Sequence, residues 1–112
     1  MADPGRVVVV AAGFALWSGG RCVAAARWSD VRRLRASRRN APPADALFLE
    51  VELVDGSRVE LHEDAPGFDA FLDRAAVTLQ GLLPFRDWHH TLDDPATGAA
   101  GVMLFERKTR RY

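Results

Sequence analysis

The densest group of possible metal ligands lies between Asp87 and Asp94, in the run Asp-Trp-His-His-Thr-Leu-Asp-Asp. On a helix, Asp87, His90 and Asp94 would share one face, and an imidazole with two carboxylates is a ligand set that suits zinc or iron. The two adjacent histidines would point about 100° apart, so they do not easily bind one ion together. Since a tryptophan and a leucine alternate with these polar residues, we expect a helix with a buried apolar face, a solvated polar face and no metal.

Two other side chains have reactive chemistry. Cys22 is the single cysteine and lies in an apolar stretch, where we expect a small buried hydrophobic residue rather than a nucleophile. His62 is a possible base, and we expect it to be solvated on the outer face of a hairpin. The chain has no Gly-x-Gly-x-x-Gly, Walker or Gly-x-Ser-x-Gly motif and no Cys-x-x-Cys pair. The sequence therefore predicts a protein that is not an enzyme and uses no cofactor.

Charge is segregated along the chain, although 15 basic residues balance 15 acidic ones overall. Between Arg21 and Arg39, seven arginines accompany one aspartate; between Asp45 and Asp73, nine acids accompany one arginine. Such opposed segments can be solvated, or can pair with each other if adjacent strands bring them together. They can also steer a partner of opposite charge and raise its rate of association.

The acidic segment gives the leading functional hypothesis, which is a protein-binding surface for a basic partner. Phe48 would be an exposed aromatic anchor at the centre of this surface. The candidate partner-binding residues are Phe48, Glu50, Glu52, Glu60, His62, Glu63, Asp64, Asp69 and Asp73.

The arginine-rich segment gives the alternative, an anion-binding module that contacts phosphates of nucleic acid or anionic lipid. Few aromatic residues interleave with these arginines, and the segment has no groove-docking motif. The candidate anion-binding residues are Arg32, Arg33, Arg35, Arg38 and Arg39.

Length and composition bound the architecture that must position these residues. A chain of 112 residues with 48% hydrophobic and 27% charged residues suits one globular domain. One cysteine allows no intrachain disulfide and fits a cytosolic location. The apolar run from Val7 to Trp17 is shorter than the ~18 residues of a transmembrane helix, and no net positive charge precedes it. We expect this run to be a buried strand rather than a signal peptide.

The N-terminal half predicts strands. Arg6 to Trp17 contains four consecutive valines and is expected to form one strand; Ser18-Gly19-Gly20 is a turn, and Arg21 to Trp28 a second strand. The segment from Trp28 to Arg39 is compatible with a bent strand or with a basic helix. A loop is expected over Asn40 to Ala44.

Alternating apolar residues from Asp45 to Glu63 predict a hairpin with one buried face. A two-residue turn would place apolar residues opposite charged ones. A three-residue loop, Val54-Asp55-Gly56, keeps the faces together and puts Gly56 at the left-handed position. In this register Val51 faces Val59 and Leu49 faces Leu61, while Glu52 faces Arg58 and Glu50 faces Glu60.

The C-terminal half predicts helices followed by a strand. Phe68, Phe71, Leu72, Ala75 and Leu79 form one apolar stripe of a helix that ends by Gly81 and Pro84. A second short helix is expected from Pro84 to Leu92, with Phe85, Trp88 and Leu92 inward. A turn-rich loop over 93–101 and a strand over 101–107 should follow.

The order of these elements resembles small bacterial proteins of pleckstrin-homology-like or GRAM-like type. The resemblance lies in Trp28-Ser29-Asp30-Val31 after the first hairpin and in Leu104-Phe105-Glu106-Arg107 in the last strand. It implies a binding module, and some proteins of this kind look like immunity proteins encoded beside toxins. It transfers no lipid site, because the Ser18-Gly19-Gly20 loop lacks the basic residues of phosphoinositide-binding members. The helices between Gly67 and Leu92 also precede a final strand, whereas the standard fold ends on its helix.

We therefore expect a single α+β domain over residues 1–107, with a flexible basic tail at 108–112. Its core would be a curved, pleckstrin-homology-like antiparallel sheet of five or six strands, covered by one long helix and a second short one, with Trp28, Trp88 and Phe105 completing the interior. The chain would be a monomer or a homodimer, since Asp45 to Leu53 has the pattern of an exposed edge strand.

Overall fold

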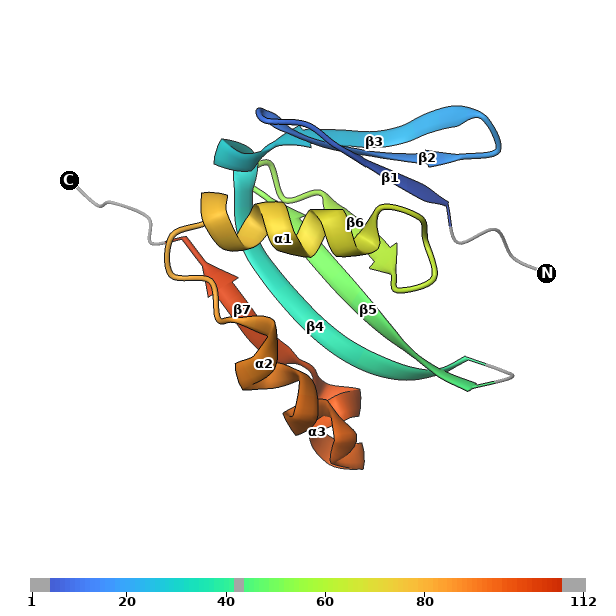
Figure 1. The fold of residues 1–112 in the computed structure, drawn as a ribbon, viewed down its shortest axis with the longest axis vertical. Helices are drawn as coiled ribbons and strands as arrows, with labels where there is room; N and C mark the ends of the chain where they lie inside the picture. The colour runs from blue at the N-terminus through green and yellow to red at the C-terminus, as the bar shows by residue number, and fades with distance from the viewer. Residues whose placement is uncertain (1–4, 42–43, 108–112) are drawn as a thin grey trace.

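The computed structural model describes residues 5–41 and 44–107, which form two antiparallel sheets and several short helices (Figure 1). The first sheet has the order β1-β2-β3, built from β1 (Arg6–Val9), β2 (Gly13–Ser18) and β3 (Arg21–Arg27). The prediction of one strand from Arg6 to Trp17 is wrong. The chain reverses between Val10 and Gly13, which exchange backbone hydrogen bonds of 2.9 and 3.3 Å.

The second sheet has the order β6-β5-β4-β7. It contains β4 (Val31–Ala41), β5 (Ala44–Leu53), β6 (Arg58–His62) and β7 (Val102–Glu106), and the single 3₁₀ turn η1 (Trp28–Asp30) leads into it. The arginine-rich segment is thus a strand and not a helix. β4 and β5 extend into the loop expected over Asn40 to Ala44, of which residues 42–43 lie outside the described part of the chain.

The β5–β6 hairpin has the predicted register. Val51 pairs with Val59, Leu49 with Leu61, Glu50 with Glu60 and Glu52 with Arg58, which confirms the three-residue loop. Gly56 has a φ of +89°. The expectation that Asp45 to Leu53 forms a sheet edge is wrong, because β5 lies between β4 and β6.

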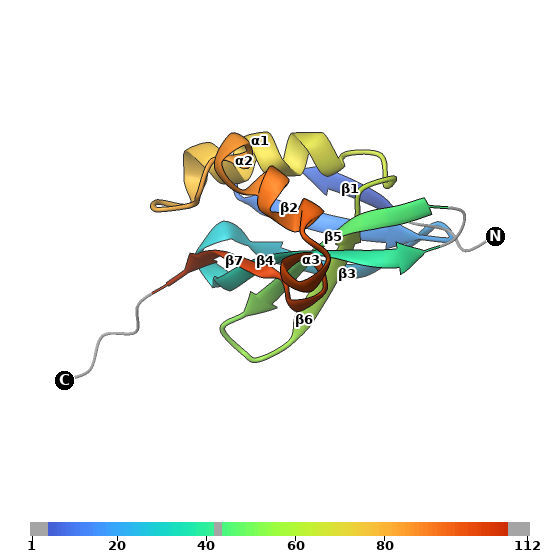
Figure 2. The same ribbon diagram turned by 90° about the horizontal axis from the view of Figure 1, so that it is seen from below.

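α1 (Phe68–Thr78) and α2 (Phe85–Trp88) lie on the same side of the four-stranded sheet, whereas α3 (Pro95–Ala100) lies level with the sheet (Figure 2). α1 matches the predicted apolar stripe, and α2 continues into the 3₁₀ helix η2 (His89–Asp93). Trp88 and Leu92 are buried as predicted, but Phe85 is 48% exposed and not inward.

The turn-rich loop expected over 93–101 contains the short helix α3 (Pro95–Ala100). Asp94 caps this helix by accepting hydrogen bonds from the backbone N–H and the hydroxyl of Thr97, at 3.0 and 2.9 Å. These bonds hold the pKa of Asp94 below its ordinary value. The expected tail at 108–112 lies outside the described residues.

One core joins the two sheets and α1. It includes the predicted inward residues of the hairpin, Trp28, Trp88 and Phe105. The ring of Phe71 on α1 lies 5.0 Å from Phe14 on β2 and 5.3 Å from Trp28, in centroid distances, and Phe14 lies 5.4 Å from Trp28. These seven strands form a single α+β domain with two sheets, instead of the single curved sheet that the sequence predicts.

The entrance to α1 is fixed to the first sheet through its backbone. Val7 of β1 donates its N–H to the carbonyl of Pro66 at 2.7 Å. Gly67, with a φ of +91°, lies so close to Val7 that a Cβ at this position would overlap the carbonyl oxygen of Val7. A side chain at position 67 would therefore separate α1 from β1.

We expect Gly67→Ala to destabilise the fold more than Gly56→Ala. Both glycines have a positive φ near 90°, so both variants carry the left-handed strain of about 1–2 kcal/mol. A Cβ at position 56 meets nothing within 4 Å, whereas at position 67 it meets backbone, which adds about 2 kcal/mol. Urea unfolding followed by tryptophan fluorescence measures the difference. Equal losses of stability would show that the contact between β1 and Gly67 does not constrain the fold.

Candidate protein-binding site

The predicted partner-binding residues lie on two different faces of the molecule. Phe48, Glu50 and Glu52 on β5, together with Glu60 and His62 on β6, lie on the outer face of the four-stranded sheet. Glu63, Asp64, Asp69 and Asp73 belong instead to the end of the β5–β6 hairpin and to α1. The sequence predicts one acidic surface, and the fold divides it.

The arginines of β4 lie on the same outer face as the glutamates of the hairpin. The β4–β5 register places Arg33 beside Glu52 and Arg35 beside Glu50. Arg33 contacts Glu52 at 3.2 Å and Glu106 at 2.6 Å, and the bond to Glu106 with the charge of Glu52 raises the pKa of Arg33 above its ordinary value. The mutual pairing that the sequence leaves open is therefore present in the structure.

The other ion pairs of the outer face also join arginines to glutamates. Arg39 contacts Glu60 at 2.8 Å, and Arg58 lies 3.7 Å from both Glu50 and Glu52. Four arginines thus accompany four glutamates on the face, which leaves it without a net charge. The eight residues are Arg33, Arg35, Arg39, Arg58, Glu50, Glu52, Glu60 and Glu106.

Phe48 is half-buried on this face and is not an exposed anchor. Its ring meets His62 edge-on at 4.7 Å between centroids, and the Arg39 guanidinium lies over it at 4.6 Å. His62 Nδ1 accepts the N–H of Asp64 at 2.9 Å and lies 3.8 Å from the Asp64 carboxylate. Phe48 therefore packs within a polar face that is already satisfied.

The arginines proposed as an anion site are also divided and largely engaged. Arg38 points to the other side of β4 from Arg33, Arg35 and Arg39, and lies 3.7 Å from Asp93. Arg32 is half-buried where the β4–β5 register shifts. No row of unpaired arginines that could follow a phosphate backbone exists in the described part of β4.

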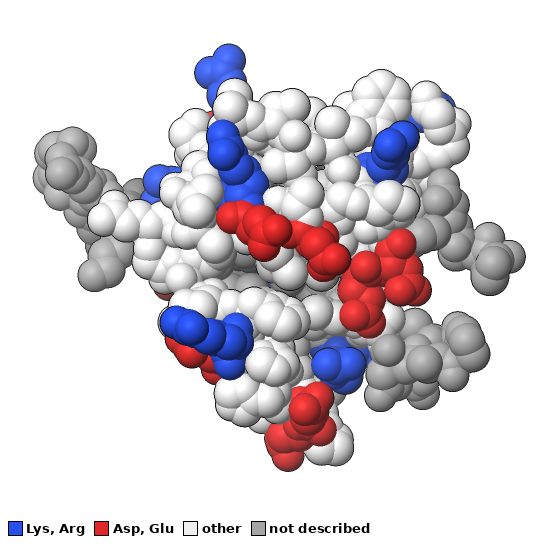
Figure 3. Space-filling view, in the orientation of Figure 1, with Lys and Arg blue, Asp and Glu red and all other residues white. Residues whose placement is uncertain are grey.

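The acids on the α1 side form no ion pair with an arginine of the described residues. Figure 3 shows acidic side chains gathered over α1 and the loop that precedes it. Asp69 and Asp73 are exposed and form no ion pair with any residue that the structure describes. Glu63 accepts the backbone N–H of Leu47 at 2.8 Å, which holds its carboxylate beside β5.

A groove of about 280 Å³ runs between α1, β5 and α2, and we call it the acidic groove. Its residues are Leu47, Glu63, Phe68, Asp69, Leu72, Asp73 and Phe85. The floor is apolar and the rim carries three carboxylates.

Phe85 is the aromatic residue of this groove that the sequence interpretation misplaces. Its ring is stacked on His89, with an interplanar angle of 8° and 4.9 Å between centroids, and meets Trp88 edge-on at 5.0 Å. His89 Nδ1 also contacts the Phe85 carbonyl at 2.9 Å. These contacts hold an exposed aromatic ring in place at the rim. The only sequence signal for it is the preceding Pro84, which marks Phe85 as the first residue of a short helix.

The candidate reactive residues do not come together. Asp87 belongs to α2, His90 to η2 and Asp94 to the cap of α3, so the single helical face assumed for them does not exist. No group of three His, Cys, Asp or Glu side chains within residues 5–41 and 44–107 is placed to hold a metal ion. Cys22 is exposed and not buried. None of the helices described is long and apolar enough to cross a membrane.

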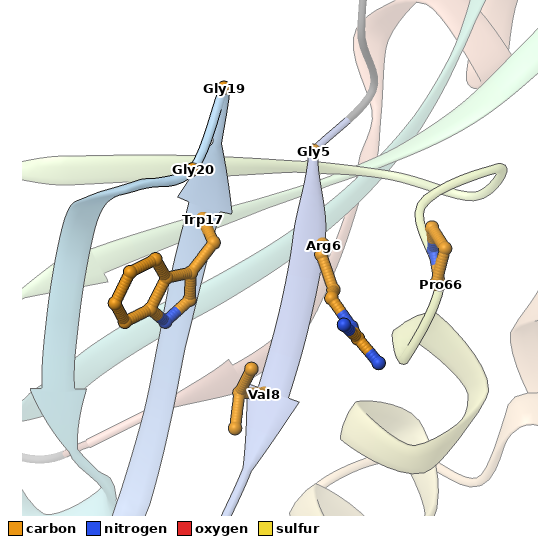
Figure 4. Close-up of a pocket in the computed structure, with 7 residues that line it drawn as sticks. All are labelled: Gly5, Arg6, Val8, Trp17, Gly19, Gly20 and Pro66. Atoms are coloured by element: carbon orange, nitrogen blue, oxygen red, sulfur yellow. The ribbon is translucent and has the colours of Figure 1, made fainter.

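The first sheet carries a different kind of surface. A hollow of about 530 Å³ beside Val8 and Trp17 is lined mainly by glycine and apolar side chains, with Arg6 as its one charged lining residue (Figure 4). Such a hollow offers no group for acid–base or nucleophilic chemistry.

Comparisons of the chain with protein-family models, with curated proteins and with solved structures find no match.

We expect Arg33→Gln to lower the melting temperature more than Arg35→Gln. Both changes remove one positive charge from the same face of β4, but only Arg33 holds two carboxylates, one of them on the well-shielded Glu52. The difference should shrink as salt is added, because exposed ion pairs are screened. Thermal unfolding by circular dichroism at two salt concentrations checks this, and equal effects of the two variants would contradict the assignment of Arg33 as the bridging cation.

Proposed function

We propose that this chain is a non-enzymatic protein-binding module that holds a basic partner protein in the acidic groove. The observation that carries the proposal is the difference between the two groups of acids. The outer-face glutamates have arginine partners, whereas Asp69 and Asp73 have none among the described residues. Uncompensated carboxylates around an apolar floor complement a partner with a basic rim and an apolar side chain at its centre.

The residues that line the groove favour a protein partner over a small ligand. Protein interfaces take much of their affinity from a few well-packed aromatic anchors that are surrounded by a polar rim. Phe85 supplies such an anchor, because its ring is exposed yet held by His89 and Trp88. Glu63, Asp69 and Asp73 supply the rim.

We further propose that the setting is that of a bacterial, cytosolic immunity protein that neutralises a basic toxin. The resemblance to pleckstrin-homology-like proteins of this kind and the single cysteine support this setting. An acidic surface that captures a basic nuclease would raise the rate of association by electrostatic steering. A pleckstrin-homology-like origin of the two sheets belongs to the same proposal.

The test is affinity capture by the tagged protein from its host lysate after nuclease treatment, with two matched double variants. Asp69→Asn with Asp73→Asn removes two unpaired carboxylates. Glu50→Gln with Glu60→Gln removes the same number from the arginine-paired face. We expect a basic protein to be captured by the wild type and by the Glu50/Glu60 variant, and to be lost from the Asp69/Asp73 variant.

Phe85→Ala should weaken this binding roughly 30-fold, as for an aromatic anchor worth about 2 kcal/mol, with little change in melting temperature because the ring is half exposed. Loss of binding in the Glu50/Glu60 variant alone would instead place the interface on the sheet. Material that is captured from untreated lysate run in parallel, and lost after nuclease treatment, would support the anion-binding alternative. Growth arrest when the captured protein is expressed alone, and rescue by this chain, would establish the immunity role.

A further inference from the structure

The first sheet ends in an edge strand that lacks the usual protection against pairing. β3 pairs with β2, and within the described residues no strand lies on its other side. Figure 1 shows β3 along the outer border of the molecule. Every second backbone N–H and C=O of an edge strand faces outward without a ladder partner. Five of the seven β3 residues are exposed and the other two are half-buried, so this edge is open to solvent.

The other sheet edges carry protective features that β3 lacks. β7 has five residues, ends in the charged Glu106, and has its Leu104 carbonyl occupied by the N–H of Leu83 at 3.1 Å. β1 has four residues, and Val7 at this edge donates to Pro66. β6 has five residues and carries charged Arg58 and Glu60 along its length. Between its terminal arginines, β3 has only Cys-Val-Ala-Ala-Ala, without charge or proline. Charged or proline residues are the common devices that prevent edge-to-edge association, so β3 is the edge of this fold most open to another strand.

The sheet that ends in this edge also carries several exposed apolar side chains. Of nine exposed large hydrophobic side chains, four belong to this sheet or its first turn, namely Val8, Val10, Trp17 and Val23. Figure 4 shows Val8 and Trp17 on the same face of the sheet, as the β1–β2 register requires. This apolar surface lies apart from the acidic groove, which is built from α1, β5 and α2.

We propose that two copies of the chain associate by antiparallel pairing of their β3 strands, which joins the two three-stranded sheets into one of six strands. A second copy is the fitting occupant because a strand edge is complementary to itself, and the uncharged centre of β3 presents nothing that opposes its own approach. The inference does not depend on the acidic groove or on the partner bound there.

The register follows from the positions of the arginines and of the irregularity in β3. Centring the pair on Ala24 would place Arg21 opposite Arg27 of the second copy, which like-charge repulsion disfavours. Centring the pair on Val23 would place the two-fold axis at the irregularity of β3, where the β2–β3 register shifts. Centring it on Ala25 uses the regular stretch 23–27, sets Val23 against the aliphatic part of Arg27, and keeps the apolar faces of both sheets on one side. Ala25 therefore lies on the two-fold axis.

The first test is the oligomeric state by sedimentation velocity, from about 10 µM to about 1 mM, the range in which small interfaces associate. We expect the average mass to rise from the 12.3 kDa monomer towards twice that value. Ala25→Lys places two positive charges on the axis and should leave a monomer. Ala76→Lys is the same change at an exposed position of α1 and should leave the dimer intact.

The second test fixes the register with disulfides in a Cys22→Ala background. Residues opposite each other on paired strands have Cα atoms within disulfide range. We expect Ala25→Cys to form a covalent dimer under mild oxidation and Ala76→Cys to stay monomeric. A wild type that is monomeric throughout the concentration range would overturn the proposal. So would a dimer that Ala25→Lys leaves unchanged, or equal cross-linking at positions 25 and 76.

Discussion

The contact of Phe71 with Phe14 and Trp28 is the constraint on which the rest of this structure depends. These three rings come from α1, from the first sheet and from the turn that leads into the second sheet, and their centroids lie 5.0–5.4 Å apart. Phe71 is fully buried, and Ala75 on the next turn of α1 is buried as well. Once this side of α1 faces the core, Asp69 and Asp73, four residues apart, must share an outward side. The burial of one ring therefore determines on which side of α1 these two carboxylates lie.

Sheet topology determines which of the other charged side chains form ion pairs. β4 lies between β5 and β7, so its outward side chains have acidic neighbours on both flanks. Arg33 contacts Glu52 on one flank and Glu106 on the other, and Arg39 reaches across Phe48 to Glu60. Exposed pairs of this kind contribute little to stability individually. Their larger effect is on surface charge, because they pair the glutamates of the sheet with arginines, whereas Asp69 and Asp73 on α1 form no ion pair with the described residues.

Local patterns in the sequence predict the elements whose periodicity is unambiguous. The strict alternation of Leu49, Val51, Val59 and Leu61 allows one hairpin register, and the stripe containing Phe68 and Phe71 allows one helix face. The run Val7 to Trp17 is apolar throughout. Neither a strand period nor a helix period can therefore be recognised in it, and the reversal of the chain before Gly13 is not predicted. The segment Arg32 to Arg39 is ambiguous between strand and helix because buried Leu34 and Ala36 are its only strong markers.

No local sequence pattern predicts that the acidic residues lie on two different faces of the molecule. Which arginine meets which glutamate depends on the order β6-β5-β4-β7, which brings Arg33 to Glu106 across 73 positions of sequence. Phe85 is misplaced for a related reason, since α2 lasts only four residues before η2 changes the helical period. Local sequence patterns thus identify the charged and aromatic residues that lie at the surface, while long-range pairing determines which of them form ion pairs with each other.

The most direct test of this account is a measurement of electrostatic potential at the surface, made without any partner. Proton relaxation in the folded protein can be compared between a cationic and an anionic nitroxide cosolute. We expect the cationic cosolute to be strongly favoured near residues 63–73 and the two cosolutes to act about equally near Glu50 and Glu60. A preference for the cation over the outer face of the sheet as strong as that over α1 would contradict the account, because the arginines of β4 would then not neutralise that face.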